Sequence, residues 1–133
     1  MTPQSTPAKR RLKILVVDDS ADAARMLAML LTIEGHDAKS AFDGASAIEL
    51  AKTFLPDVGL LDLGMPRMDG FELAKRLTAL PELSHTILVA MTGFNDSEDI
   101  RRTKECGFQH FLVKPVEPTA FLAFLASLPT SQS

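Results

Sequence analysis

The sequence predicts an α/β fold in which five parallel strands alternate with five helices. Residues 14–17 and 58–61 are almost continuously hydrophobic, as expected for strands that helices cover on both faces. Segments with helical periodicity separate the strands, which is the pattern of successive βα units. The chain has 133 residues, of which 46% are hydrophobic, and this suits one domain with one core.

The strands and helices can be placed in order along the chain. The strands are expected at residues 12–17, 37–41, 57–61, 86–91 and 109–113. The second of these is the most polar and is expected at an edge of the sheet. The helices are expected at residues 21–34, 44–54, 70–80, 97–106 and 118–127.

Apolar residues recur on one face of the first two helices. The apolar face of the first helix is expected to contain Ala24, Leu27, Leu30 and Leu31. That of the second is expected to contain Ile48, Ala51 and Leu55. This spacing predicts helices that bury one side against the sheet.

Helix ends carry their own signals. Gly35 and Gly107 stand where a left-handed helix terminus favours glycine. Asp69 followed by Glu72 has the spacing of a capping box, and Pro118 suits a first helical turn. These residues support the predicted starts and ends of four helices.

Composition and the chain ends exclude several classes of function. Residues 1–11 and 129–133 are expected to be disordered tails around a globular part at 12–128. A net charge of -3 gives no general footprint for nucleic acid, and no stretch approaches the roughly 20 apolar residues of a membrane span. No signal peptide is recognised, and the single cysteine, Cys106, excludes an internal disulfide. A cytoplasmic protein is expected.

Charged and hydroxyl side chains follow the predicted strands. Because parallel strands end at the same edge of a sheet, these side chains are expected to converge there, where ligands of open α/β sheets bind. They are Asp18, Asp19, Asp62, Thr92 and Lys114. Carboxylates beside an ammonium group suggest a site for a divalent cation and a phosphoryl group.

Oxygen ligands of this kind suit Mg²⁺, with Mn²⁺ as an alternative ion. Mg²⁺ usually takes one or two carboxylates and fills its other positions with water and phosphate oxygens. Asp19 and Asp62 are the expected direct ligands, Asp18 is expected to act chiefly through water, and the backbone carbonyl of Gly64 would complete the protein ligands.

Asp62 is the expected nucleophile, because a carboxylate can attack phosphorus to give an aspartyl phosphate. The ammonium of Lys114 and the hydroxyl of Thr92 would then stabilise the negative phosphoryl oxygens. Each residue alone has a structural explanation, such as a helix cap, a turn or a surface lysine. Their combination at successive strand ends favours the functional interpretation.

The chain resembles the receiver domains of two-component response regulators. Four segments carry the resemblance: 14–20 (ILVVDDS), 60–73 (LLDLGMPRMDGFEL), 89–93 (VAMTG) and 111–115 (FLVKP). It implies a flavodoxin-like three-layer sandwich with strand order 2-1-3-4-5. It also implies that the chain is a signalling phosphoacceptor rather than an enzyme, although it would assist its own phosphorylation.

Further implications of the resemblance concern the site and its partners. Asp62 would receive a phosphoryl group from a histidine kinase or a histidine phosphotransfer protein, with Mg²⁺ at Asp18, Asp19 and Asp62 and charge pairing by Lys114. Thr92 and Phe111 would move together and change the surface of the fourth helix, fifth strand and fifth helix. The partner would dock along the first helix, near three residues: Ser20, Ala21 and Ala24.

The chain departs from many receivers at Gly64 and Phe94, where a polar side chain is common. Neither residue can orient an attacking water through a side-chain hydrogen bond, so slow loss of the phosphoryl group is expected. Gly64 and the segment MTGF also resemble receivers of hybrid sensor histidine kinases. A free-standing regulator without an attached output domain and a piece of a hybrid kinase therefore both fit.

Two other functions use parts of the same residue set. A magnesium-dependent phosphohydrolase that forms an aspartyl phosphate generally carries a second aspartate two residues after the nucleophile, where this chain has Gly64. A receiver-like binding module that works without phosphorylation would not need Asp19, Asp62, Thr92 and Lys114 together.

Overall fold

A computed structural model describes residues 11–63, 70–93, 97–113 and 117–128, apart from the side chains of 97–100 and 118. Its strands are β2 (Lys13–Val17), β3 (Asp37–Ala41), β4 (Val58–Asp62), β5 (Ile87–Thr92) and β6 (His110–Val113). Its helices are α1 (Ala21–Ile33), α2 (Gly44–Phe54), α3 (Gly70–Thr78), α4 (Ser97–Glu105), α5 (Pro118–Ser127) and the short 3₁₀ helix η1 (Pro81–Leu83).

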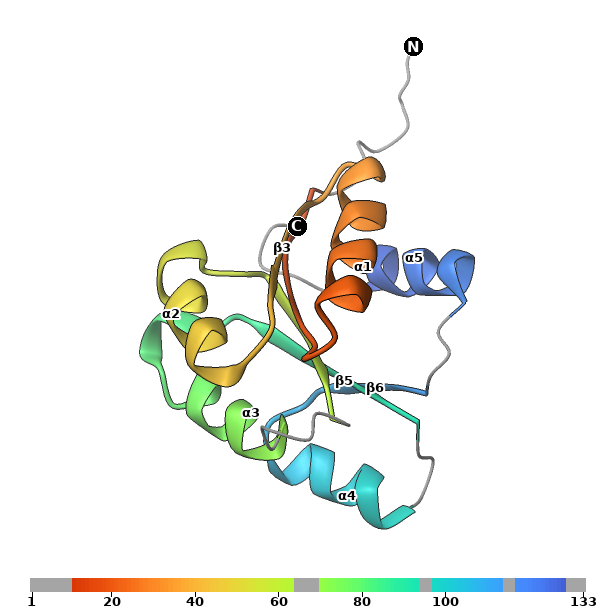
Figure 1. The fold of residues 1–133 in the computed structure, drawn as a ribbon. Coiled ribbons are helices and arrows are strands. Elements are labelled where there is room, and N and C mark those ends of the chain that lie inside the picture. Colours follow the sequence, from red (N-terminus) through yellow and green to blue (C-terminus); the bar gives the residue numbers. More distant parts are fainter. Residues whose placement is uncertain (1–10, 64–69, 94–96, 114–116, 129–133) are drawn as a thin grey trace.

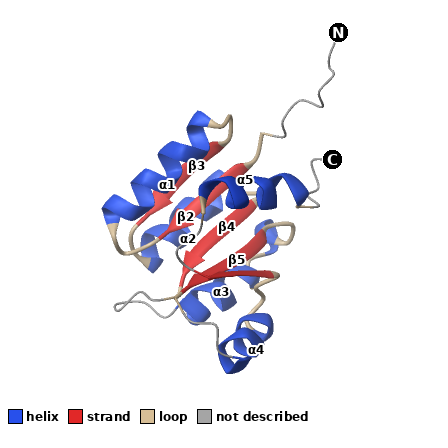
Figure 2. Cartoon of the chain, turned by 90° about the vertical axis from the view of Figure 1, so that its right-hand side faces the viewer, coloured by secondary structure: helices blue, strands red, loops and turns tan. Residues whose placement is uncertain are grey.

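The five strands form one parallel sheet in the order β3-β2-β4-β5-β6. In order of appearance this is 2-1-3-4-5, so the predicted topology is confirmed. Helices α1 and α5 cover one face of the sheet, and α2 and α3 cover the other (Figures 1 and 2). The result is the expected three-layer α/β sandwich.

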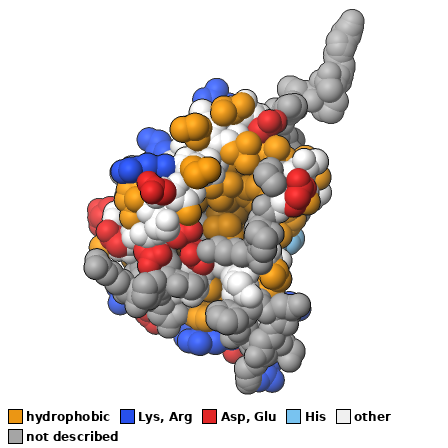
Figure 3. All heavy atoms as spheres, turned by 45° about the vertical axis from the view of Figure 1, so that its right-hand side comes forward, with side chains coloured by type: hydrophobic (Ala, Val, Ile, Leu, Met, Phe, Trp, Pro, Cys, Tyr) orange, Lys and Arg blue, Asp and Glu red, His pale blue; other side chains and the backbone are white. Residues whose placement is uncertain are grey.

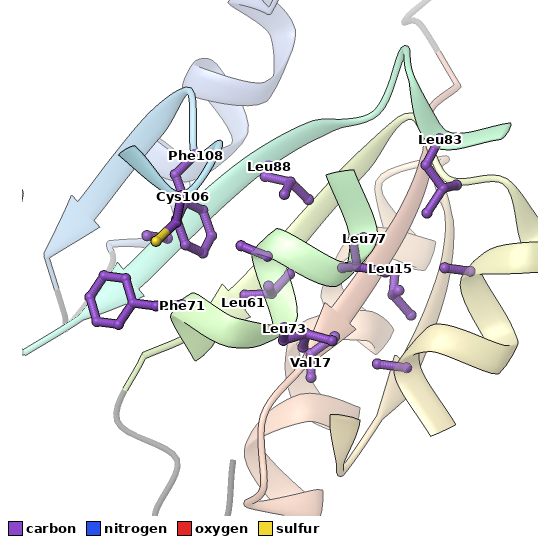
Figure 4. Packing of buried hydrophobic residues seen from close by; sticks show 14 of the residues in the cluster. Leu15, Val17, Leu61, Phe71, Leu73, Leu77, Leu83, Leu88, Cys106 and Phe108 are labelled. Carbon is purple, nitrogen blue, oxygen red and sulfur yellow. The ribbon is translucent and has the colours of Figure 1, made fainter. Parts of the chain in front are cut away.

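Each face of the sheet has its own hydrophobic cluster. The first joins β2, β4 and β5 to α2, α3 and the turn that follows α4; Figure 4 labels ten of its members. The second joins the other side of these strands to α1 and α5. Strand β4 is buried along its whole length, as expected for a central parallel strand. Strand β3 buries only Ala41, which confirms its predicted edge position.

The helix ends agree with several sequence signals. Gly35 and Gly107 have φ of 101° and 103°, the left-handed conformation that glycine adopts without strain. Pro118 begins α5, and the carboxylate of Glu117 accepts a hydrogen bond from the Ala120 N–H at 2.8 Å. The predicted capping box at Asp69 falls outside the described residues.

Several boundaries differ from the prediction by one or two residues, and two local departures concern Asp62 and Leu55. The third strand begins and ends one residue later than expected, so Asp62 is its last member rather than the residue after it. Leu55, expected on the apolar face of α2, is instead a left-handed C-cap with φ of 53° and is 45% exposed. The reason is Pro56, which disfavours helical backbone in the residue before it. In the described part of the chain, no helix is both long and apolar enough to cross a membrane.

Candidate functional site

The turn from β2 to α1 fixes Asp18 at the carboxyl end of the sheet. Its N–H donates to the Ala41 carbonyl at 3.2 Å, and its Oδ1 accepts a hydrogen bond from the Ser20 N–H at 3.0 Å. The Ser20 hydroxyl in turn caps α1 by accepting from the Ala23 N–H at 3.3 Å. The Asp18 side chain is therefore both buried and oriented, with 6% exposure.

Strand β4 delivers Asp62 to the same edge. Asp62 pairs with Met91 of β5, and the next residue continues the ladder because the Leu63 N–H donates to the Met91 carbonyl at 2.8 Å. The side chain of Asp62 is 5% exposed, whereas Asp19 lies half-buried in the turn after β2. One carboxylate oxygen from each of Asp18, Asp19 and Asp62 lies within 4.8 Å of the other two.

This spacing fits a divalent cation. Oxygens bound to one Mg²⁺ at about 2.0–2.1 Å are at most about 4.2 Å apart, so only a small closure of the cluster is needed. Three carboxylates at such distances repel one another, and a cation would relieve that repulsion. The donor set is all oxygen, which favours Mg²⁺ or Mn²⁺ over softer metals.

Thr92 and Phe111 lie on the strands beyond β4. Thr92 ends β5, one residue past the partner of Asp62, and is 2% exposed. Phe111 is half-buried in β6 opposite Ala90 and packs against the first hydrophobic cluster. Lys114, Gly64 and Phe94 fall outside the described residues.

The expected docking residues are only partly accessible. Ser20 is exposed and Ala21 is half-buried at the start of α1, but Ala24 is fully buried against the sheet. Ala24 itself therefore cannot contact a partner, because it belongs to the face that α1 buries in the core, and docking near the start of α1 stays a prediction.

The opposite side of α1 carries an apolar stripe that the sequence reasoning missed. Met26, Met29 and Ile33 are 70%, 62% and 72% exposed. Their spacing of three and four residues indicates one shared face of a helix, but it does not show from the sequence whether that face is buried or exposed. Figure 3 shows hydrophobic side chains gathered on the side of the molecule that carries α1 and α5.

An open depression of about 360 Å³ lies at the other end of the strands. Two basic and two acidic residues line it together with Leu55: Arg11, Lys13, Asp37 and Asp57. The carboxylate of Asp57 accepts a hydrogen bond from the Lys13 N–H at 2.8 Å, which ties the start of β2 to the residue before β4. The charges that line the depression are mixed, and none of the predicted site residues is among the lining residues.

The chain is similar in sequence to known proteins. Residues 14–126 match the family model of the response regulator receiver domain. The response regulator PleD of Caulobacter vibrioides is 37% identical over 116 residues, which are 87% of this chain and 26% of PleD. The chain thus spans about a quarter of that relative. An uncharacterized 14.6 kDa protein of Leptolyngbya boryana is 36% identical over 81% of this chain and 82% of its own length.

Solved structures give the same result. The chemotaxis protein CheY4 of Vibrio cholerae superimposes with a TM-score of 0.82 at 31% identity, covering 87% of this chain and 97% of that one. The receiver domain of a DNA-binding response regulator from Colwellia psychrerythraea gives a TM-score of 0.77 at 30% identity, covering 85% and 94%. With this sheet order, this acidic cluster and a family match over most of its length, the chain belongs to the response regulator receiver domains of two-component systems.

Proposed function

We propose that Asp62 accepts a phosphoryl group from a phosphohistidine, with Mg²⁺ held by Asp18, Asp19 and Asp62. Receiver domains are signalling phosphoacceptors that bind Mg²⁺ at an acidic pocket and interact with histidine kinases or phosphotransfer proteins. The observation that carries the proposal is the cluster of three carboxylates within 4.8 Å at the carboxyl ends of β2 and β4.

The chemistry requires Asp62 to act as a nucleophile. A carboxylate oxygen of Asp62 forms the new P–O bond as the P–N bond to the donor imidazole breaks, and the imidazole then takes a proton from solvent. Mg²⁺, when bound, would offset the negative charge of the phosphoryl oxygens. Asp18, held by the Ser20 N–H, would support the cation chiefly through water.

Two further residues are assigned roles on the sequence alone. The carbonyl of Gly64 would complete the metal ligands, and the ammonium of Lys114 would pair with the phosphoryl oxygens. The buried hydroxyl of Thr92 at the end of β5 would donate to the same oxygens, while Phe111 changes its packing. Such contacts would bias a two-state equilibrium of the surface formed by α4, β6 and α5.

The partner is proposed to dock along α1. The stripe of Met26, Met29 and Ile33 starts about two turns after the acidic cluster and offers apolar contact to a helix of a histidine kinase or phosphotransfer protein. Ser20, the N-cap of α1, is exposed beside Asp18. Output would follow through protein contact or onward transfer of the phosphoryl group.

We place the receiver domain at residues 12–128. Leu12 and Leu128 are each 1% exposed and belong to the second hydrophobic cluster, so a shorter piece would open the core. Residues 1–11 and 129–133 remain the predicted tails.

The test is incubation with acetyl phosphate and Mg²⁺, followed by intact mass. One added phosphoryl group is expected in the wild type and in Asp22→Asn, a control that removes an exposed carboxylate from the first turn of α1. None is expected in Asp62→Asn or after chelation of the metal. An adduct that persists in Asp62→Asn would refute the assignment.

The phosphoryl adduct, together with an assay for released phosphate, separates the alternative functions. A binding module that works without phosphorylation would gain no mass under any condition. A phosphohydrolase would release inorganic phosphate from an added phosphomonoester over many turnovers.

The wild type is expected to lose its phosphoryl group slowly. Gly64→Asn should lose it faster, because the variant adds a polar side chain that can orient water. Equal rates would contradict that reasoning.

A further inference from the structure

Few of the described side chains of helix α4 are buried. Among its described side chains, those of residues 101–105, only that of Thr103 is buried. Arg102 is exposed, yet its guanidinium carbon lies 3.9 Å from the centroid of the Phe71 ring in α3. Cation–π attraction acts within about 6 Å. This contact therefore joins the described part of α4 to α3.

Phe71 also meets the chain that follows α4. It is 9% exposed and belongs to the same hydrophobic cluster as Cys106 and Phe108. Figure 4 shows these three side chains at the same end of the cluster. Phe71 is thus positioned to contact α4 through Arg102 and its C-terminal connection through Cys106 and Phe108.

The first turn of α3 abuts the strand that carries the proposed phosphoacceptor. A Cβ added at Gly70 would lie 2.8 Å from Cδ2 of Leu63 and 3.3 Å from the backbone oxygen of Asp62. The backbone of α3 is therefore in contact with the end of β4, with no room between them. A displacement of Asp62 or Leu63 toward α3 would therefore press on Gly70, the neighbour of Phe71.

We propose that Arg102 is a positioning residue that couples the state of Asp62 to the orientation of α4. This inference rests on the proposed function, because its signal is phosphorylation of Asp62. The contact with Phe71 stabilises the position of α4 in which Arg102 lies over the ring. When the first turn of α3 shifts, the guanidinium and the ring separate, and the equilibrium of α4 moves. This route runs through α3 and is distinct from the one proposed for Thr92.

Hydrogen exchange of the α4 amides tests the contact. The variants are Arg102→Met, which removes the cation, Phe71→Leu, which removes the ring, and the double variant. Without phosphodonor, exchange in α4 should be roughly 2- to 5-fold faster in each single variant, the factor expected for an exposed cation–π contact. The double variant should show little further change, because both substitutions remove the same contact. Lys104→Met, which removes an exposed charge from the same helix, should exchange like the wild type.

The coupling is then tested by adding beryllofluoride, a phosphoryl mimic, with Mg²⁺. In the wild type and in Lys104→Met the exchange of α4 should change, and in Arg102→Met that change should fall by at least half. Urea unfolding of Arg102→Met and Lys104→Met, and their phosphoryl adduct with acetyl phosphate measured by intact mass, should stay close to the wild type.

The outcomes separate the two proposals. Absence of any adduct in the wild type would overturn the proposed function and the coupling with it. A normal adduct in Arg102→Met together with a wild-type response of α4 would overturn the coupling alone. An equal loss of response in Lys104→Met would also overturn it, because the effect would then follow the charge of α4 and not the ring contact.

Discussion

Without Mg²⁺, the substitution Asp18→Asn should stabilise the fold. The carboxylate oxygens of Asp18, Asp19 and Asp62 lie within 4.8 Å of one another. At that separation the repulsion of two unit charges is about 1–3.5 kcal/mol for an effective dielectric constant between about 80 and 20. Asparagine removes the charge of residue 18 and keeps an oxygen that can accept from the Ser20 N–H.

A weaker hydrogen bond offsets part of this gain. A bond to a charged acceptor contributes about 1 kcal/mol more than a neutral one, so the free energy of unfolding should rise by a net of up to about 2.5 kcal/mol. Urea unfolding in chelator measures it. Asp22→Asn is the matched control: it removes an exposed carboxylate from the first turn of α1 and should cost up to about 1 kcal/mol through the helix dipole.

With Mg²⁺ added, the wild type should become more stable than Asp18→Asn. The cation stabilises the wild type in proportion to the logarithm of its concentration above the dissociation constant, and Asp18→Asn should lose most of that gain. Asp22→Asn should keep it. If Asp18→Asn is destabilised in chelator, or if both variants respond to Mg²⁺ like the wild type, repulsion within the cluster does not govern the site.

Two further predictions concern stability. Urea unfolding should show that Gly107→Ala is destabilised more than Gly35→Ala. Both glycines have a positive φ, which costs an alanine about 1–2 kcal/mol. Only at Gly107 would the new Cβ also meet the Thr78 methyl group, at 2.7 Å. This overlap should add about 1 kcal/mol, recovered by Thr78→Ser, and equal losses for the two glycines would contradict it. Hydrogen bonds from the Ser46 hydroxyl and N–H lower the pKa of Asp43 below its usual 3.8, so the carboxylate contributes stability above that pH and loses it as the pH falls through the lowered pKa. The stability gap between wild type and Asp43→Ala should therefore narrow below about pH 4, and a gap that widens in acid would reverse the sign.

The topology could be predicted from the sequence because the strands differ in polarity. The central strand β4 is apolar up to its last residue, Asp62, whereas the edge strand β3 is not, and glycine at positions 35 and 107 marks two helix ends. The convergence of Asp18, Asp19 and Asp62 followed from parallel strands ending at one edge. Strand polarity and parallel topology therefore bring the carboxylates together without knowledge of any side-chain contact.

The surface of α1 could not be predicted in the same way. Apolar residues occupy both the buried face, with Ala24, and the exposed face, with Met26 and Ile33, so periodicity alone did not separate core from docking surface. The contact of Arg102 with Phe71 could not be predicted either, because the two residues belong to different helices. A basic residue on a polar helix does not show in the sequence which aromatic ring it contacts. Such contacts are decided by how helices pack together.

The outer strand β3 has a consequence for behaviour at high concentration. The outer edge of an edge strand can pair with a strand from another molecule, which can start aggregation. Here Lys39 is exposed in the middle of the strand, and its ammonium lies 5.3 Å from the centroid of the Phe54 ring. An incoming strand would have to desolvate that charge. Replacing Lys39 with valine should leave the monomer folded but raise its tendency to aggregate.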